Sequence, residues 1–215
     1  MLKLIILGRR ASGKSRRAAQ DHLKMVHGRM VVCPPADAGA MPARYVQNHV
    51  IDGIYPSGST AHGVERDLVT ELWFDDFDHL RGSTSTPYYL DNLKPDEPRF
   101  VDDSSVAKMV VRPEVMVEGE RGTFKVFLAA GSASDALDQL VTSARGIGGS
   151  VRNVALPPPD GSAPFVPLIY EAWFEALDDA YALLDSFAVS LPADAAHSFA
   201  VVAEQYDSAR LAKLF

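Results

Sequence analysis

The sequence predicts a three-layer α/β fold with a mostly parallel sheet, a β-hairpin insertion and C-terminal helices. Two observations lead to it. Strand-like and helix-like segments alternate at the start of the chain and again in its third quarter. The first strand-like run, Leu2–Leu7, ends in a glycine and is followed by the helix-like stretch Ser15–His27. This is the order of a β-α unit. We expect residues 1–215 to form a single domain of this type.

Length and composition indicate an ordinary globular protein. The chain has 215 residues, of which 47% are hydrophobic and 23% charged, so it can build a core. A net charge of -7 excludes a polycation that coats nucleic acid, but not a local basic patch. Cys33 is the single cysteine, which excludes an internal disulfide and a zinc site of several thiolates. No apolar run approaches the ~18 residues of a membrane helix, so we expect a cytoplasmic protein with no membrane partner.

The other elements follow from apolar runs and the residues that break them. Met30–Cys33 is expected to be a short strand that ends at Pro34, and residues 34–63 are expected to be irregular. Val115–Val117 and Thr123–Ala130 predict a β-hairpin with a glycine-containing turn. No internal repeat is apparent. A helix capped by Ser134, a strand and two further helices are expected at Asp135–Arg145, Val151–Leu156, Leu168–Ala188 and Ala193–Leu214.

A glycine-rich motif follows the first expected strand. Residues 8–15, GRRASGKS, match the phosphate-binding pattern G-x4-G-K-[ST] in full. Glycines let the backbone turn successive N–H groups toward one anion, and the following helix directs the positive end of its dipole there. Lys14 would reach the β- and γ-phosphates, and Ser15 would help to hold Mg2+. The predicted nucleotide-binding residues are Gly8, Arg9, Arg10, Ala11, Ser12, Gly13, Lys14, Ser15 and Arg16.

Residues 2–27, which contain this motif, resemble the first β-α unit of a P-loop NTPase. The resemblance implies that the cofactors are ATP and Mg2+. It also implies an enzyme that hydrolyses the nucleoside triphosphate, with Lys14 in a catalytic role.

A second acidic segment resembles the Walker B pattern of the same family. Leu72–Phe74 is a short apolar run that ends in Asp75 and Asp76. In a strand, Asp75 would hold the metal together with Ser15, and Asp76 would polarise the attacking water. The alternative is a helix over residues 64–80 whose acidic residues face solvent, because the spacing of apolar residues fits both. Phe100–Asp103 is a weaker candidate, for which a loop fits better.

The use of the nucleotide is open between two classes. Residues 4–10 and 137–156 resemble HerA/FtsK-like ATPases, including viral genome-packaging ATPases. That resemblance implies a homo-oligomeric motor on double-stranded DNA, in the host cytoplasm or virion if viral, with Arg145 as a catalytic finger acting in trans. Arg145 facing the dipole of its own helix is the simpler alternative. The second class is a small-molecule or nucleotide kinase.

Overall fold

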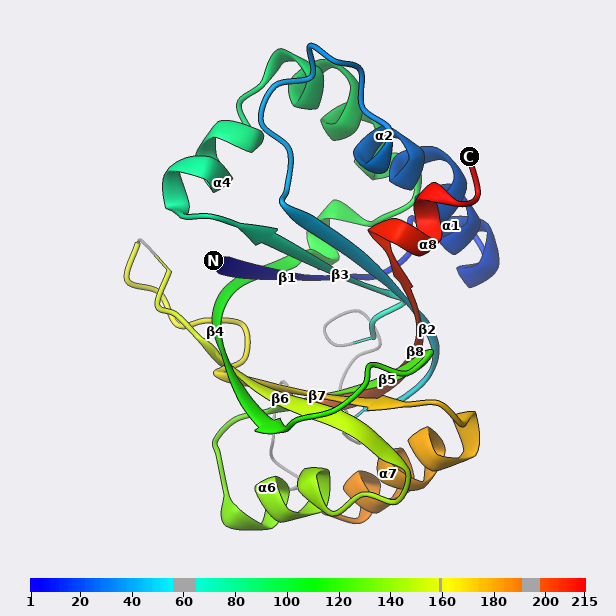
Figure 1. The fold of residues 1–215 in the computed structure, drawn as a ribbon, viewed down its shortest axis with the longest axis vertical. Helices are drawn as coiled ribbons and strands as arrows, with labels where there is room; N and C mark the ends of the chain where they lie inside the picture. Colours follow the sequence, from blue (N-terminus) through cyan, green and yellow to red (C-terminus); the bar gives the residue numbers. More distant parts are fainter. Residues whose placement is uncertain (56–64, 159, 191–197) are drawn as a thin grey trace. The chain divides into compact units, whose positions relative to one another are not determined.

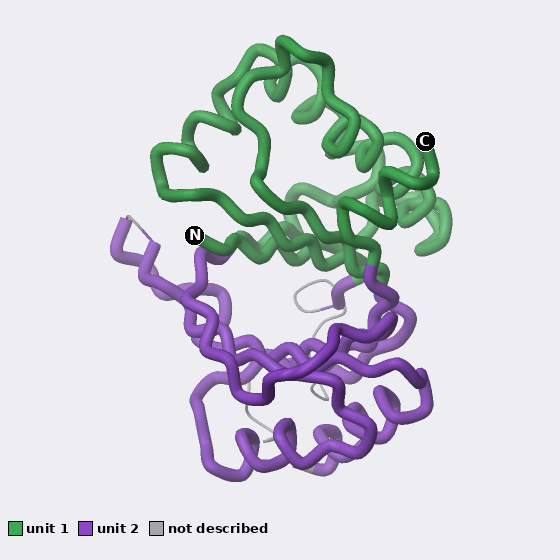
Figure 2. Tube along the Cα trace, viewed as in Figure 1, with its two compact units in different colours: residues 1–49, 67–108, 206–215 green, residues 50–66, 109–205 purple. Residues whose placement is uncertain are grey.

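The computed structural model describes residues 1–55, 65–158, 160–190 and 198–215. The chain divides into two compact units, coloured separately in Figure 2. Unit 1 holds residues 1–49, 67–108 and 206–215, and unit 2 holds residues 50–66 and 109–205. That residues 1–215 act as a single domain stays a prediction.

The sheet of unit 1 is antiparallel. It contains β1 (Leu2–Gly8), β3 (Leu68–Phe74) and the first part of β2 (Arg44–Ile54) in the order β1-β3-β2 (Figure 1). Antiparallel pairing places Leu2 opposite Phe74 and Gly8 opposite Leu68. The predicted first strand and the strand interpretation of residues 72–74 are confirmed, and the helix alternative for residues 64–80 is wrong. β2 was missed, because it lies in the stretch expected to be irregular.

One helical stretch follows β1. It consists of α1 (Arg16–His22), the π-helical turn η1 (Leu23–His27) and α2 (Gly28–Val32). The strand expected at Met30–Cys33 is therefore wrong, since the helix runs on to Val32 and Cys33 is its C-terminal cap. Six shorter elements complete unit 1: α4 (Phe77–Ser83), η2 (Tyr89–Leu93), α5 (Lys94–Asp96), η3 (Glu97–Arg99), η4 (Asp103–Ser105) and α8 (Ser208–Ala212).

Gly28 allows β2 to approach the π-helical turn. The side-chain amide of Gln47 donates a hydrogen bond of 2.8 Å to the Leu23 carbonyl. A Cβ on Gly28 would lie 2.5 Å from Gln47 Nε2 and 3.0 Å from that carbonyl oxygen. We expect Gly28→Ala to lower the free energy of unfolding by ~1–3 kcal/mol through this overlap. Urea denaturation measures it. Gly82→Ala, in α4 with nothing within 4 Å of its Cβ, is the control. An equal loss in both variants would contradict the steric argument.

The sheet of unit 2 is also antiparallel, with the strand order β8-β5-β7-β6-β4. Its strands are β4 (Ala107–Val117), β5 (Phe124–Ala130), β6 (Ile147–Ala155), β7 (Leu168–Phe174) and β8 (Phe199–Asp207). β4 and β8 also extend into unit 1 at one end. The expected hairpin of β4 and β5 is wrong, because β4 pairs with β6, whereas β5 lies between β7 and β8.

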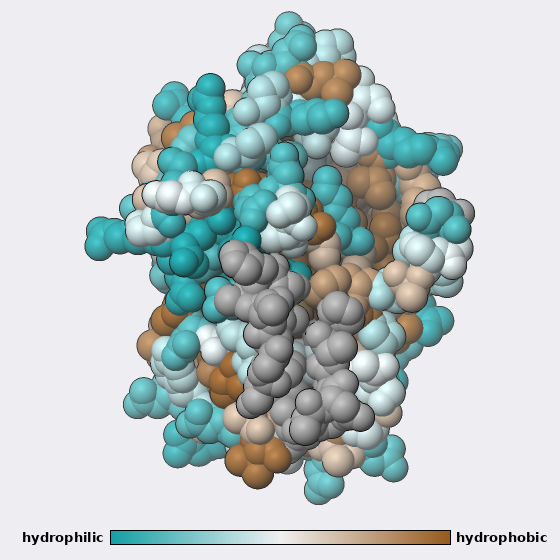
Figure 3. Space-filling model, turned by 180° about the vertical axis from the view of Figure 1, so that it is seen from behind, coloured by the Kyte–Doolittle hydropathy of each residue, from teal (hydrophilic) through white to brown (hydrophobic). Residues whose placement is uncertain are grey.

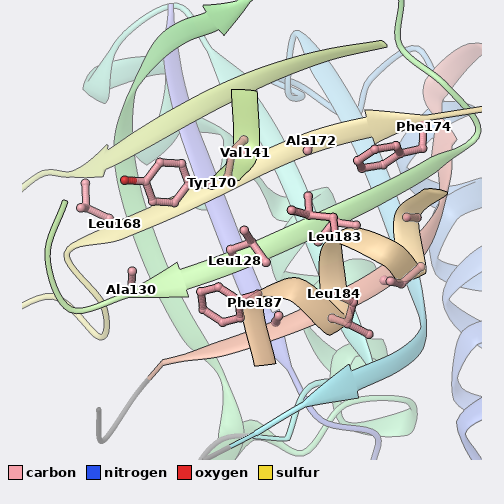
Figure 4. Close-up of a cluster of buried hydrophobic side chains, with 14 residues drawn as sticks. Leu128, Ala130, Val141, Leu168, Tyr170, Ala172, Phe174, Leu183, Leu184 and Phe187 are labelled. Carbon is pink, nitrogen blue, oxygen red and sulfur yellow. The ribbon is translucent and has the colours of Figure 1, made fainter. Parts of the chain in front are cut away.

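Two helices cover one face of the unit 2 sheet. They are α6 (Asp135–Thr142) and α7 (Leu177–Ser190). The predicted cap of α6 is confirmed, since Ser134 Oγ accepts from the Leu137 amide at 3.2 Å. Figure 4 shows Leu183, Leu184 and Phe187 of α7 beside residues of β5 and β7. The buried core on this face consists of Val126, Leu128, Ala130, Val141, Leu168, Tyr170, Ala172, Phe174, Ala180, Leu183, Leu184, Phe187, Ala200 and Val202.

The predicted three-layer α/β fold with a parallel sheet is wrong. Every strand pair whose register is described is antiparallel. The C-terminal helices are also partly wrong. The expected helix Leu168–Ala188 is β7 followed by α7, and β8 and α8 occupy residues 199–212 of the second expected helix. The start of that second helix, at 193–197, lies outside the described residues. No helix among the described residues is long and apolar enough to cross a membrane.

Candidate functional site

A histidine–aspartate–histidine cluster lies in unit 1. Asp96, the last residue of α5, accepts from His22 Nε2 at 2.9 Å through Oδ1 and from His27 Nδ1 at 3.2 Å through Oδ2. His22 ends α1, and His27 ends η1. Their spacing of five residues matches the repeat of a π-helical turn, so both imidazoles reach the same carboxylate. Short π-helical segments occur often at functional sites.

The cluster is largely withdrawn from solvent. The side chains of His22, His27 and Asp96 are 17%, 11% and 5% exposed. Phe100 closes one side, with its ring centroid 5.6 Å from that of His22 and 4.9 Å from that of His27. Arg99 Nη1 lies 3.8 Å from Asp96 Oδ1. This surrounding holds the imidazoles in place, and low solvent exposure strengthens their hydrogen bonds to the carboxylate.

The carboxyl of Asp96 is held ionised. Burial alone raises its pKa, but hydrogen bonds from His27 and His22, and the charge these rings carry when protonated, outweigh that effect and lower the pKa below its ordinary value. An ionised Asp96 accepts a hydrogen bond from each ring. The described residues leave Nδ1 of His22 and Nε2 of His27 without a hydrogen bond. A histidine whose other nitrogen is fixed by a carboxylate is the arrangement of a general base.

The lowered pKa of Asp96 predicts a pH-dependent stability. Ionised Asp96 makes its full contribution to the free energy of unfolding above the ordinary pKa of about 4. This contribution is lost as the pH falls through the lower folded-state pKa. We expect Asp96→Asn to lower the free energy of unfolding by ~1–3 kcal/mol relative to wild type at pH 7. This difference in the free energy of unfolding should decrease as the pH falls below about 4. Urea titrations from pH 7 to pH 3 measure it, with the exposed Asp78→Asn as the control. A gap that stays constant over this range would contradict the ionised Asp96.

A separate open pocket of about 860 Å³ lies in unit 1. It is lined by Leu90, Lys94, Pro95, Glu97, Pro98, Asp103, Val106 and Lys108. Two lysines and two carboxylates line it, so the ionic residues carry no excess of either sign. In the view of Figure 3, hydrophobic residues form several small groups among hydrophilic ones. The pocket lining therefore indicates no preference for an anionic or a cationic ligand, whereas the histidine cluster contains groups that can accept a proton.

The motif at residues 8–15 does not form a phosphate cradle. Four of its backbone amides donate to protein acceptors: Arg9 to Ser105 Oγ, Arg10 to Asp67 Oδ2, Ala11 to the Phe100 carbonyl and Lys14 to the Ala11 carbonyl. Ser15 Oγ accepts from the Ala18 amide and caps α1. Gly13 has a φ of 77°, which favours glycine in this turn without any ligand.

The arginines of the motif are held by carboxylates. Arg9 pairs with Asp102 at 2.7 Å. Arg10 and Arg16 pair with the buried Asp67 at 3.0 and 2.8 Å. The remaining predicted nucleotide-binding residues are the buried Gly8 and Ala11, the half-buried Lys14, and the exposed Ser12, Gly13 and Ser15.

The two halves of the predicted metal site are not brought together. Ser15 follows the C-terminal end of β1, whereas Asp75 follows Phe74, which pairs with Leu2 at the other end of β1. Seven residues of strand separate these ends, or ~20 Å. Asp76 instead caps α4 by accepting from the His79 amide at 2.8 Å, and Asp75 pairs with the His79 ring at 3.3 Å.

Arg145 belongs to unit 2. It follows α6 and pairs with Asp179 of α7 at 2.5 Å, with its side chain 75% exposed. As catalytic residues, Lys14, Asp76 and Arg145 remain predictions that no described contact tests.

The comparisons with known proteins point away from a P-loop enzyme. The EthD domain family matches residues 11–104, which is less than half of the chain and includes the whole histidine cluster. No curated protein matches the sequence significantly.

Solved structures resemble the whole chain at low identity. A proposed monooxygenase from Fusobacterium nucleatum is 7% identical over 95% of this chain and 91% of its own, with a TM-score of 0.50. One from Lactobacillus acidophilus is 14% identical over 95% and 93%, with a TM-score of 0.49. A proposed chlorite dismutase is 8% identical over 100% and 99%, with a TM-score of 0.47. The first of these likenesses shows a shared fold.

These findings overturn the predicted activity. The P-loop NTPase resemblance, the ATPase or kinase activity, the viral packaging motor and the cofactors ATP and Mg2+ are wrong. The EthD match includes residues 11–15 of the motif, and the antiparallel sheet around β1 differs from the mostly parallel sheet expected of a P-loop NTPase. The double-stranded DNA partner and the homo-oligomer were expected from the motor interpretation and stay untested predictions. The cytoplasmic location stays a prediction.

The sequence analysis missed the histidine cluster. Asp96 lies in a loop-like stretch between two prolines, 74 residues from His22, so no local pattern connects them. The one local signal was the pair His22 and His27, whose spacing of five fits neither an α-helix face nor a strand face.

Proposed function

We propose that unit 1 carries the acid–base site of an enzyme that acts on a small organic molecule, with His22 as the general base. The hydrogen bonds of both histidines to the ionised Asp96 carry this proposal. Asp96 orients each ring and stabilises the imidazolium that forms when the base accepts a proton. The EthD match supports it, because it includes His22, His27, Asp96 and Phe100.

His22 is preferred to His27 as the base. Its side chain is more exposed, at 17% against 11%. Its Nε2 donates a hydrogen bond to Asp96, so the lone pair that can accept a substrate proton is on Nδ1. In this role His27 supports the site by donating a second hydrogen bond to Asp96, which keeps that carboxylate fixed. His27 is therefore a positioning residue, and its substitution should cost less activity than that of His22.

Monooxygenation is the second candidate function. It is favoured by the fold shared with the Fusobacterium nucleatum protein named as a proposed monooxygenase. A fold alone does not determine an activity, so this candidate rests on a weaker observation. The two candidates differ in one measurable respect, since a monooxygenase consumes molecular oxygen and simple proton transfer does not.

A panel of phenols and 1,3-diketones, which carry acidic O–H or C–H groups, tests the proposal. Deuterium incorporation from D2O reports proton transfer at carbon, and an oxygen electrode reports oxygen uptake. We expect His22→Gln to lower the rate by about 10²–10⁴-fold, and Asp96→Asn and His27→Gln to lower it by less. His79→Gln is the matched control, because His79 also contacts a carboxylate in unit 1. A wild-type rate in folded His22→Gln, or no reaction of wild type with the panel, would count against the proposal.

A further inference from the structure

The two units repeat one pattern of strands and residues. β1, β3 and β2 of unit 1 occupy the same sheet positions as β5, β7 and β6 of unit 2. β3 reads LVTELWF and β7 reads LIYEAWF, so the leucine, glutamate, tryptophan and phenylalanine coincide. In the paired strands Lys3 lies opposite Trp73, and Lys125 lies opposite Trp173. An internal repeat, which is not apparent from the sequence, is therefore present.

A buried lysine–glutamate–asparagine cluster occurs once in each unit. In unit 1, Lys3 Nζ lies 2.8 Å from Glu71 Oε1, and Asn48 Nδ2 donates to Glu71 Oε2 at 2.9 Å. In unit 2, Lys125 Nζ lies 3.0 Å from Glu171 Oε2, and Asn153 Nδ2 donates to Glu171 Oε1 at 2.8 Å. The ammonium also lies over the indole of the paired tryptophan, at 5.0 Å in unit 1 and 4.6 Å in unit 2.

Both clusters lie on the sheet face opposite the helices. In β7, Tyr170, Ala172 and Phe174 belong to the core under α6 and α7, so Glu171 between them points to the other face. In β3, Leu68 packs with residues of the helical stretch after β1, which places Glu71 on the opposite face. Lys3, Glu71, Lys125 and Glu171 are at most 3% exposed.

One atom lacks a partner at the same place in both clusters. Each asparagine Nδ2 donates twice, to the glutamate and to the carbonyl of Val69 or Ile169. Among the described residues, no donor reaches Asn48 Oδ1 or Asn153 Oδ1, although both side chains are fully buried. Buried acceptors in proteins are almost always satisfied. An unfilled acceptor that recurs in both units indicates a missing donor of the same kind at each.

We propose that each unit carries a buried binding site for a hydroxyl group, in which Asn48 Oδ1 or Asn153 Oδ1 accepts its hydrogen bond. The donor is the O–H of water or of a small organic molecule such as a phenol. The lysine and glutamate beside each asparagine disfavour an apolar group in the site, because an apolar group cannot donate a hydrogen bond to the asparagine oxygen. Buried ion pairs are often no more stabilising than apolar side chains, so their retention in both units fits a binding role. The proposal stands without the proposed function, because the histidine cluster shares none of these residues.

The test uses the carboxamide Nδ2 protons of Asn48 and Asn153, observed by NMR in the wild-type protein. A long-lived bound water gives a cross-relaxation signal to these protons in both units. A phenol titration distinguishes the second source, because a bound phenol shifts both pairs of signals and removes the water signal. Either result supports the proposal. Absence of a water signal and of any phenol-induced shift at both residues would overturn it.

The repeat supplies its own control. Leucine has nearly the shape of asparagine but lacks the carboxamide and its Nδ2 protons, so Asn153→Leu removes the unit 2 signal itself and should leave the Asn48 signal unchanged. Asn48→Leu should do the reverse. A folded Asn153→Leu that loses the Asn48 signal as well would contradict two separate sites. If a variant fails to fold, the wild-type measurement still decides. His22→Gln should leave both signals unchanged while it lowers activity, which separates this test from that of the proposed function.

Discussion

Glu171→Ala is expected to destabilise the protein by about 3–5 kcal/mol, because it removes a buried carboxylate that pairs with the buried ammonium of Lys125. Lys125 Nζ and Glu171 Oε2 are 3.0 Å apart, and their side chains are 1% and 0% exposed. Asn153 also loses one of its two acceptors. Urea denaturation followed by circular dichroism measures the change.

The double variant Lys125→Met/Glu171→Leu separates the cost of removing one partner from the contribution of the ion pair to stability. It removes both charges and keeps the volume, so we expect stability close to that of wild type. Glu71→Ala, the equivalent change in unit 1, should resemble Glu171→Ala. A double variant as unstable as Glu171→Ala would show that the ion pair itself stabilises unit 2.

Asp67→Ala is expected to cost about 3 kcal/mol, through loss of the carboxylate that holds the loop after β1. Its side chain is 2% exposed, and it accepts from Arg10 Nη1 at 3.0 Å, from Arg16 Nε at 2.8 Å and from the Arg10 amide at 2.9 Å. The estimate is below the full cost of breaking a buried pair, because the two arginine side chains are 37% and 42% exposed.

Asp21→Asn is the matched control for Asp67→Ala. Asp21 pairs with Arg17 at 3.7 Å on the surface of α1, where an ion pair contributes less than about 1 kcal/mol. Thermal or urea unfolding of both variants measures the contrast. Equal stability of the two variants would contradict the structural role given to the arginines of the glycine-rich motif.

The sequence predicted the elements whose pattern is local. β1 is a short apolar run before glycine, and α6 has a serine cap and one apolar face. β7 was mistaken for part of a helix because all seven of its residues are buried, which removes the alternation that identifies a strand. The relative direction of the strands could not be predicted from local patterns either, because the antiparallel pairing of β1 with β3 joins residues about 70 positions apart.

The glycine-rich motif shows why a local match can mislead. Residues 8–15 fit the phosphate-binding pattern in every position, but the pattern does not record which acceptors take the amide hydrogens. Asp67, Ser105 and the Phe100 carbonyl take three of them, and all three lie at least 50 residues further along the chain. The histidine cluster could not be predicted for the same reason, because Asp96 comes into contact with His22 and His27 only in the folded unit.

The tautomers of His22 and His27 test the central claim most directly. Long-range ¹H–¹⁵N NMR correlations of the imidazole rings, recorded at a pH where both are neutral, identify the protonated nitrogen of each. The geometry predicts a proton on Nε2 of His22 and on Nδ1 of His27, since these atoms face the ionised Asp96 at 2.9 and 3.2 Å. In Asp96→Asn both preferences should weaken. A proton on Nδ1 of His22 in the wild-type protein would contradict its role as the general base.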